Sequence, residues 1–207
     1  IGRARVVPLR NTGAAISPFN AFLILQGIET LALRMDRICN NALKIANFLK
    51  NHPKVSWVNY AGLPDHKDNA LVQKYMDGRA SGILNFGVKG GLAGGGKFQD
   101  ALQLVTRLVN IGDCKTLACH PASTTHQQLS PEEQLATGVT PGLVRLAVGL
   151  EGIDDILADL QRGFAAAAAV PRRVPSPLLP RAPLPPRAPL RLRDVRAPAR
   201  SSVAATA

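Results

Sequence analysis

The chain has 207 residues and a formal net charge of +11, but residues 165–207 hold eight Arg and one Asp, so the first 164 residues are only mildly basic. Its three cysteines, Cys39, Cys114 and Cys119, form neither a disulfide framework nor a CxxC zinc motif, and they fit a reducing, cytoplasmic compartment. No apolar run approaches the roughly 18 residues that a membrane-spanning helix needs.

The N-terminal part predicts an extended segment followed by one long helix. Residues 1–16 are interpreted as extended. Ser17 is a suitable N-cap with Pro18 at the first helical position, so we expect a helix from about Pro18 to Asn51. The first half of this helix is apolar on nearly every side, which is typical of a helix wedged between two bodies.

Strands and helices alternate along the next hundred residues. The glycine cluster 90–96 is expected to be a mobile loop. The alternating order of helices and strands predicts an α+β fold with helices on one face of a sheet. Strands are predicted at 55–60, 83–88, 116–119 and 143–148, and helices at 69–76, 98–108, 132–137 and 153–164.

Arg145 lies in the middle of an apolar strand, on the same face as Leu143 and Ala147. A buried guanidinium costs several kcal/mol unless an anion or a set of acceptors meets it, and its planar fork matches a carboxylate. A structural ion pair with Asp or Glu, or a strand edge open to water, explains Arg145 at least as well. The polar turn Asn110–Asp113 could help to hold a carboxylate, but the residues alone do not bring the two together.

Two other motifs have simpler interpretations than a functional site. Gly91–Lys97 matches the phosphate-loop pattern GxxxxGK, but Phe98 replaces the Ser or Thr that would hold magnesium, which favours a flexible connection over nucleotide binding. His120 and His126 are six residues apart and Pro121 interrupts any helix between them, so loop histidines are favoured over metal ligands.

Residues 165–207 consist mainly of Ala, Arg, Pro and Leu and are predicted to be a disordered tail. A basic module that binds acidic surfaces or nucleic acid is one interpretation of this tail. The scattered arginines and the lack of interleaved aromatics favour a tail without a binding task, so nucleic acid is not expected as a partner.

Three segments in order resemble the C-terminal domain of the pyridoxal-phosphate enzymes of cysteine and methionine metabolism. They are SPFNAFLILQGIETLALRM, NIGDCKTLACHPASTTHQQL and GVTPGLVRLAVGLE, and the resemblance covers about residues 1–164. The NIGD turn and the PASTTH run favour the O-acetylhomoserine sulfhydrylase branch, because the cystathionine-handling branches usually carry a Ser-Leu-Gly turn.

The resemblance implies the small C-terminal domain of a fold-type I transferase, with a mostly antiparallel sheet, helices on one face and a long N-terminal helix. Residues 1–16 would connect this part to a preceding cofactor domain. Residues 17–164 would form the domain itself and residues 165–207 its tail.

For the site, the resemblance implies that Arg145 binds the substrate α-carboxylate, that Asn110 positions it and that Thr125 lies near the substrate. The reaction would eliminate acetate from O-acetylhomoserine and add sulfide or methanethiol, with pyridoxal 5′-phosphate as electron sink. The Schiff-base lysine would belong to the cofactor domain, because none of the eight lysines here has the family's lysine context. This polypeptide alone is therefore expected to be inactive.

The family also implies a cytoplasmic homotetramer without a membrane partner. Two relatives with different activities remain as alternatives: a methionine γ-lyase and a cystathionine-handling enzyme. Outside the family, the basic tail and the glycine motif leave nucleic-acid binding and nucleotide binding as the competing functions.

Overall fold

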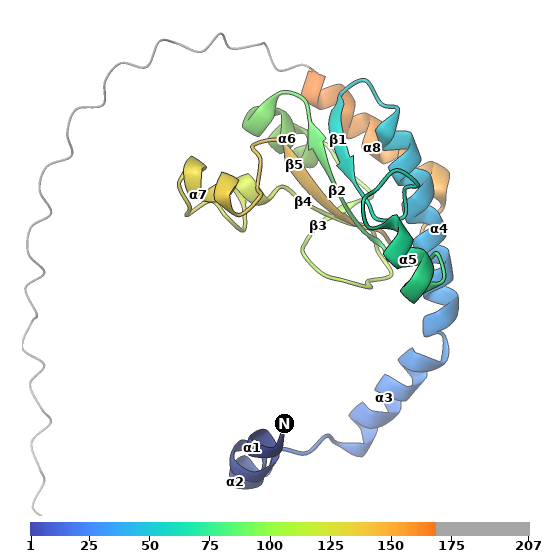
Figure 1. The fold of residues 1–207 in the computed structure, drawn as a ribbon, viewed down its shortest axis with the longest axis vertical. Helices are drawn as coiled ribbons and strands as arrows, with labels where there is room; N and C mark the ends of the chain where they lie inside the picture. Colours follow the sequence, from blue (N-terminus) through green and yellow to red (C-terminus); the bar gives the residue numbers. More distant parts are fainter. Residues whose placement is uncertain (169–207) are drawn as a thin grey trace, which may run out of the picture. The chain divides into compact units, whose positions relative to one another are not determined.

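The computed structural model describes residues 1–168, which contain a five-stranded sheet with helices packed on one face (Figure 1). The strand order is β1-β2-β5-β4-β3; the β3–β4 pair is parallel and the other pairs are antiparallel. The predicted α+β class and mostly antiparallel sheet are confirmed. The strands are β1 (Val55–Asn59), β2 (Ile83–Val88), β3 (Thr106–Arg107), β4 (Leu117–Cys119) and β5 (Leu143–Ala147).

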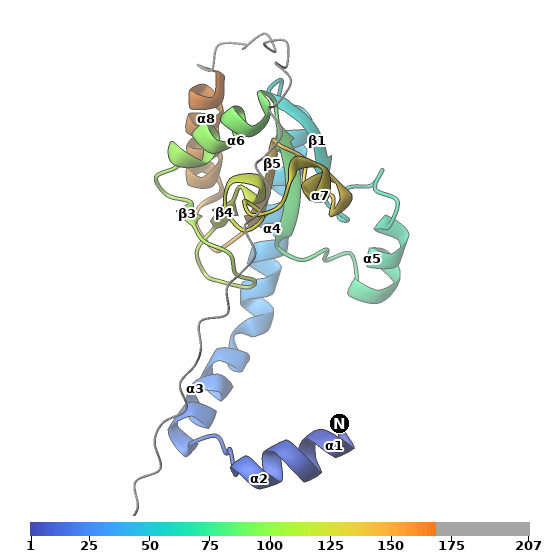
Figure 2. The ribbon, with the colours of Figure 1, turned by 90° about the vertical axis from the view of Figure 1, so that its left-hand side faces the viewer.

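Three helices cover the apolar face of the sheet: α4 (Leu31–Lys50), α6 (Gly91–Asp100) and α8 (Ile153–Ala168). Helices α6 and α8 lie side by side in both ribbon views (Figures 1 and 2). Phe86 of β2, Phe98 of α6 and Phe164 of α8 meet in the core, with ring centroids 4.7–6.0 Å apart. Burying such rings drives the helices onto the sheet, because each removes a large apolar area from water.

The predicted long helix is two helices, α3 (Pro18–Glu29) and α4, which are separated at Thr30. Ser17 caps α3 as expected and accepts a hydrogen bond from the Asn20 backbone N–H at 3.2 Å. Near the break, the Arg34 guanidinium donates to the Gly27 carbonyl. Glycine and threonine are weak helix formers, so a break here costs little. Helix α3 has no buried residue, whereas α4 has seven.

Residues 1–16 are not extended as predicted. They form a short helix α1 (Gly2–Ala4), a π-helical turn (Arg5–Leu9) and α2 (Arg10–Thr12), which ends at Gly13 with a φ of +63°. None of these residues is buried. Among residues 1–168 no strand pairs with this segment, and the backbone hydrogen bonds that it makes there are local helical ones.

The glycine cluster is also helical, so the predicted loop at 90–96 and the predicted helix at 98–108 are both wrong. Helix α6 begins at Gly91 and ends at Asp100, and Leu108 is exposed instead of facing inward. Helix α6 does not continue beyond Asp100 because the next backbone N–H groups bond elsewhere. The buried carboxylate of Asp159 in α8 accepts hydrogen bonds from the backbone N–H groups of residues 103–105 at 2.9–3.1 Å. Residues 91–97 therefore form part of a helix instead of the loop that the pattern GxxxxGK describes.

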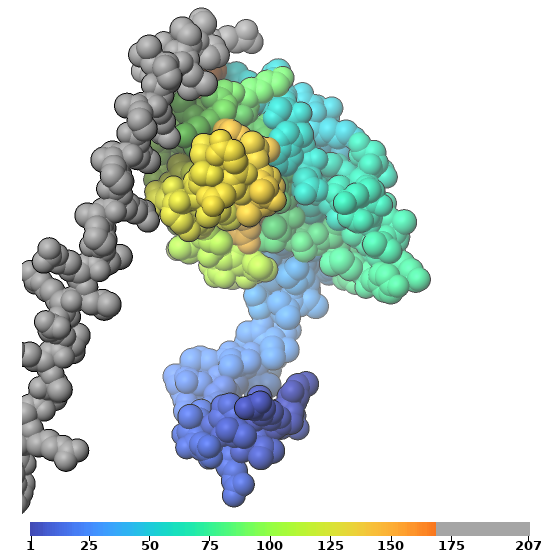
Figure 3. Space-filling view, turned by 60° about the vertical axis from the view of Figure 1, so that its left-hand side comes forward, coloured from blue at the N-terminus to red at the C-terminus, as the bar shows by residue number. Residues whose placement is uncertain are grey.

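The remaining elements agree closely with the sequence. Helix α5 (Asn69–Met76) has the predicted bounds, and α7 (Pro131–Ala136) begins with a capping box between Ser130 and Glu133. In the space-filling view, α7 and its flanking turns form a raised lobe (Figure 3, yellow). Helix α8 begins as predicted but runs four residues beyond Phe164. The rest of the predicted tail, residues 169–207, lies outside the described residues.

None of the helices within residues 1–168 combines the length and the apolarity that a bilayer crossing would require.

Candidate substrate-carboxylate site

Arg145 lies on the central strand β5, on the sheet face that α4, α6 and α8 leave open. Its neighbours Val144 and Leu146 are completely buried under the helices, so alternation directs Arg145 to the other face. In the sheet register Arg145 lies between Asn85 of β2 and Cys119 of β4. Arg145 as a whole is half-buried, in a row of residues that crosses the sheet.

The Arg145 guanidinium reaches the predicted polar turn. Its Nη2 donates to the backbone carbonyl of Asn110 at 3.2 Å. No Asp or Glu within residues 1–168 forms an ion pair with Arg145, so the structural ion pair considered from sequence is not observed. A guanidinium has five N–H donors, and one bond to a carbonyl leaves others able to meet an incoming carboxylate.

The side chain of Asn110 is folded into its own turn. Its Oδ1 accepts from the Ile111 N–H at 2.9 Å, and its Nδ2 lies 3.5 Å from Oδ2 of Asp113. The other oxygen of Asp113 accepts from the Lys115 N–H at 3.0 Å. Gly112 completes the turn with a φ of +76°, which a residue with a Cβ rarely adopts. Asn110 thus meets Arg145 through its carbonyl, while its amide shapes the turn.

A second group of residues, which the sequence did not indicate, anchors this turn to the end of β5. Glu151 accepts from both the backbone N–H and the hydroxyl of Thr116, at 2.6 and 2.7 Å. The same hydroxyl accepts from the Gly149 N–H at 2.9 Å, and the Leu150 N–H donates to the Cys114 carbonyl at 2.9 Å. These bonds join segments 35 residues apart, a separation at which no sequence pattern signals a contact.

Thr125 is not joined to Arg145 in the way that Asn110 is. Its hydroxyl is 2.8 Å from Nδ1 of His126, and the structure gives it no hydrogen bond to Arg145 or Asn110. Its neighbour Thr124 is connected to the site, because Oγ1 of Thr124 lies 3.3 Å from Sγ of Cys119, the register partner of Arg145. Cys119, Thr124 and Asn85 are therefore further candidates that sequence reasoning missed, since only strand pairing brings them together.

His120 has a structural role and is not a metal ligand. It is completely buried, its Nε2 lies 2.8 Å from the Pro141 carbonyl, and its Nδ1 lies 2.7 Å from Oγ of Ser123. Because a carbonyl only accepts, Nε2 carries the proton. Burial lowers the pKa of His120, partly offset by the bond to Pro141. No cluster of three or more metal-ligating side chains occurs in the described part of the chain.

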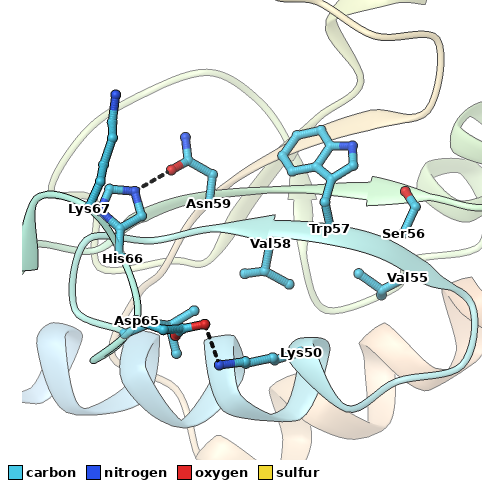
Figure 4. Close-up of a pocket in the computed structure, with 10 residues that line it drawn as sticks. Lys50, Val55, Ser56, Trp57, Val58, Asn59, Asp65, His66 and Lys67 are labelled. Carbon is cyan, nitrogen blue, oxygen red and sulfur yellow. Dashed lines mark hydrogen bonds and ion pairs between the residues drawn. The ribbon is translucent and has the colours of Figure 1, made fainter.

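A cavity of about 690 Å³ lies elsewhere, along the edge strand β1 (Figure 4). Its polar groups bind one another: Lys50 pairs with Asp65 at 2.7 Å, and His66 contacts Asn59 at 2.7 Å. The Lys50 ammonium lowers the pKa of Asp65 through this bond. None of the predicted site residues lines this cavity, so its size alone does not mark the functional site.

The described residues do not by themselves fit a covalently held pyridoxal phosphate. A Schiff-base lysine needs a dry surrounding that lowers its pKa. Seven of the eight lysines are exposed, and the half-buried Lys54 donates to the Phe164 carbonyl at 3.2 Å. This part of the protein therefore offers an anion-binding arginine but no lysine anchor.

Comparison with known proteins places the fold and the arginine strand in context. The sequence model of the Cys/Met metabolism PLP-dependent enzymes matches residues 3–165. The chain belongs to this family. Pyridoxal phosphate is accordingly the cofactor of the family, and the resemblance noted from the three sequence segments is confirmed.

The relatives include two activities. O-acetyl-L-homoserine sulfhydrylase of Leptospira meyeri is 59% identical over 163 residues, which are 78% of this chain and 37% of that protein. O-acetyl-L-homoserine sulfhydrylase 1 of Thermus thermophilus is 49% identical, over 80% of this chain and 39% of that protein. L-methionine gamma-lyase of Pseudomonas putida is 46% identical, over 81% of this chain and 42% of that protein. The chain thus spans about two fifths of the length of these relatives.

A solved structure supports the same assignment. The crystal structure of a Campylobacter jejuni protein assigned as an O-acetylhomoserine (thiol)-lyase superposes with a TM-score of 0.71 at 43% identity. The match covers 79% of this chain and 39% of that one, and the Campylobacter protein contains N′-pyridoxyl-lysine-5′-monophosphate. At this identity the likeness extends beyond the fold to the family.

Proposed function

We propose that this chain forms the substrate-carboxylate-binding part of an O-acetylhomoserine sulfhydrylase that depends on pyridoxal phosphate. The observation that carries this proposal is Arg145, a half-buried residue whose guanidinium lacks an Asp or Glu partner within residues 1–168 and donates to the Asn110 carbonyl. The names of the Leptospira and Thermus relatives support the choice of reaction. The substrates would be O-acetylhomoserine and sulfide or methanethiol.

In this proposal each part of the site has a defined task. Arg145 binds the α-carboxylate of the amino-acid substrate through its planar fork and so fixes the orientation of the substrate. The Asn110–Asp113 turn holds the guanidinium in place, and the Thr116–Glu151 bonds hold the turn. When bound, pyridoxal phosphate supplies the electron sink that this chemistry requires.

The lysine and the remaining cofactor contacts would come from the other three fifths of the enzyme. Residues 1–16 would connect the two parts, and residues 17–164 would be the C-terminal domain. The 207-residue chain alone is then inactive. The exposed apolar helix α3 supports a homo-oligomer, and the three free cysteines fit a cytoplasmic protein.

Substitution of Arg145 in the intact enzyme tests the proposal. Arg145→Leu should raise the KM for O-acetylhomoserine by about 100-fold, and Arg145→Lys by about tenfold because the charge remains but the fork is lost. Arg79→Leu is the control, since Arg79 is exposed and pairs with Asp36 at 2.8 Å. A KM that is unchanged in Arg145→Leu would refute the assigned role.

A methionine γ-lyase is the second candidate, because a relative of that name is 46% identical. Assaying the intact enzyme with methionine alone, with cystathionine, and with O-acetylhomoserine plus sulfide separates the branches. Faster turnover of methionine in the absence of a thiol would favour the lyase. Homocysteine formation only when sulfide is supplied would support the sulfhydrylase.

A further inference from the structure

Asn85 of β2 is the register partner of Arg145 and lies on the same open face of the sheet. Its sequence neighbours Leu84 and Phe86 are buried in the core under the helices, so the pleat turns Asn85 to the face that carries Arg145. Residues directly opposite each other on antiparallel strands have Cβ atoms about 4.5–5.5 Å apart. The side chains of Asn85 and Arg145 therefore start next to each other on this face.

The Asn110–Asp113 turn faces the next row of the sheet. A cavity of about 290 Å³ is lined jointly by residues 111–112 of this turn and by Ile83 and Ala147, which are themselves register partners. The Ile83–Ala147 pair is displaced by two residues, about 7 Å, from the pair that Arg145 forms. The turn thus borders both strands, so the space beside it, where the Arg145 guanidinium lies, is bounded by β2 as well as by β5.

The Asn85 amide is both unpaired and accessible. In the described part of the chain no hydrogen bond involves it, and the one fully enclosed side-chain N or O atom without a partner there is Oε1 of Gln99. The amide of Asn85 is therefore open to a ligand, and so are Nε and Nη1 of Arg145, for which the same residues offer no partner. On the other side of Arg145, Sγ of Cys119 already contacts Oγ1 of Thr124.

We propose that Asn85 is a second contact for the α-carboxylate of the substrate. Its Nδ2 donates to one carboxylate oxygen while the Arg145 guanidinium binds the same carboxylate from β5. A carboxylate accepts several hydrogen bonds, and donors on two neighbouring strands fix its orientation better than one side chain does. The amide also adds a donor without adding a second charge to a half-buried site. This inference rests on the proposed function for the identity of the ligand, whereas the free amide beside Arg145 stands on the structure alone.

Substitutions in the intact enzyme give the first test. Asn85→Ala should lower kcat/KM for O-acetylhomoserine about tenfold through a higher KM, the usual effect of losing one hydrogen bond to a charged group. Asn85→Asp has the same shape and should lower it about 100-fold, because its carboxylate repels that of the substrate.

Asn59→Ala is the matched control for these variants. Asn59 lies opposite Asn85 on β1, one strand farther from Arg145, and its Oδ1 contacts His66 at 2.7 Å (Figure 4). Its substitution should leave kcat/KM within twofold. An unchanged KM in Asn85→Ala, together with a raised KM in Arg145→Leu, would overturn the role of Asn85 and leave the proposed function intact.

A double variant separates contact with the substrate from support of the arginine. If Nδ2 of Asn85 touches the carboxylate, Asn85→Ala should still lower kcat/KM by about threefold or more in the Arg145→Leu enzyme. If Asn85 acts only by holding the guanidinium, the second substitution has no further effect, and that result would overturn the proposal.

The 207-residue chain supplies a test that needs no variant and no catalysis. The side-chain signals of Asn85, Asn59 and Arg145 are followed by ¹H–¹⁵N NMR while sodium butyrate is added at constant ionic strength, with butyramide as a neutral probe of similar size. The Asn85 amide should shift saturably with butyrate and about fivefold less with butyramide, while Asn59 does not respond. A shift of Arg145 alone would overturn the inference but not the proposed function. No saturable shift of either residue would contradict both.

Discussion

Glu151 and Thr116 are joined by two hydrogen bonds, one to the backbone N–H at 2.6 Å and one to the hydroxyl at 2.7 Å. We expect Glu151→Ala to lower the free energy of unfolding by about 2 kcal/mol, because both donors lose an ionised acceptor. Amide exchange across residues 110–115 should accelerate. Glu151→Gln keeps one acceptor and should show about half the loss. Unchanged exchange in Glu151→Ala would show that the turn is held by other contacts.

Gly95 and His120 pack so closely that a Cβ on Gly95 would overlap Nε2 of the imidazole. Since both ring nitrogens of His120 are hydrogen-bonded, the ring cannot yield, and Gly95→Ala should cost about 2 kcal/mol. Gly96→Ala is a matched control: it lies in the same helix, has open space around it and should stabilise by about 0.5–1 kcal/mol. Urea unfolding measures the free energy of unfolding of both variants. Equal changes in the two variants would contradict the close packing of Gly95 against His120.

Stability should fall as the pH drops below about 6.5, the usual pKa of histidine. Burial lowers the pKa of His120 and also that of His52, so below about pH 6.5 the unfolded chain binds protons that the folded chain does not yet bind. Each histidine can change the free energy of unfolding by at most about 1.4 kcal/mol per pH unit. His120→Asn should flatten this dependence in urea titrations, whereas an unchanged slope would assign it to other groups.

Helix α3 should make the chain bind apolar dyes. Phe19, Phe22 and Leu25 are each more than half exposed, and no residue of the helix is buried. Anilinonaphthalene sulfonate fluorescence should rise with the chain and fall in Phe22→Gln/Leu25→Gln, with no change in the free energy of unfolding. Gln26→Ala in the same helix is the control. If the chain does not increase the fluorescence of the dye, the exposed face of α3 is covered in solution.

The sequence predicted those elements whose signals are local. Helix α5, strand β2 and the Ser130–Pro131 start of α7 follow from capping, periodicity and strand composition within a few residues. The end of α6 shortly after Phe98 could not be predicted, because the backbone that follows bonds to the carboxylate of Asp159, more than 50 residues away in the sequence. Likewise, the glycines of α6 signalled a loop, whereas tertiary packing against His120 uses them in a helix.

The candidate site was predictable in part. An arginine in an apolar strand and a polar turn rich in hydrogen-bonding groups are visible in the residues, and the structure brings Arg145 and Asn110 together. Which atom of Asn110 meets the guanidinium was not visible, because that depends on the bonds inside the turn. Cys119 and Asn85 were missed because strand register, which no local pattern encodes, sets them beside Arg145.

The alternation along β5 also protects the sheet against mispairing. If β5 slipped by one position against β2 and β4, Arg145 would enter the apolar layer between the sheet and its helices, and Val144 and Leu146 would turn to the open side. Burying the guanidinium without a partner and exposing two aliphatic side chains to water would each raise the free energy of that register. The same residue that we propose to grip the substrate therefore also acts as a folding safeguard, one that disfavours an alternative topology before any ligand is present.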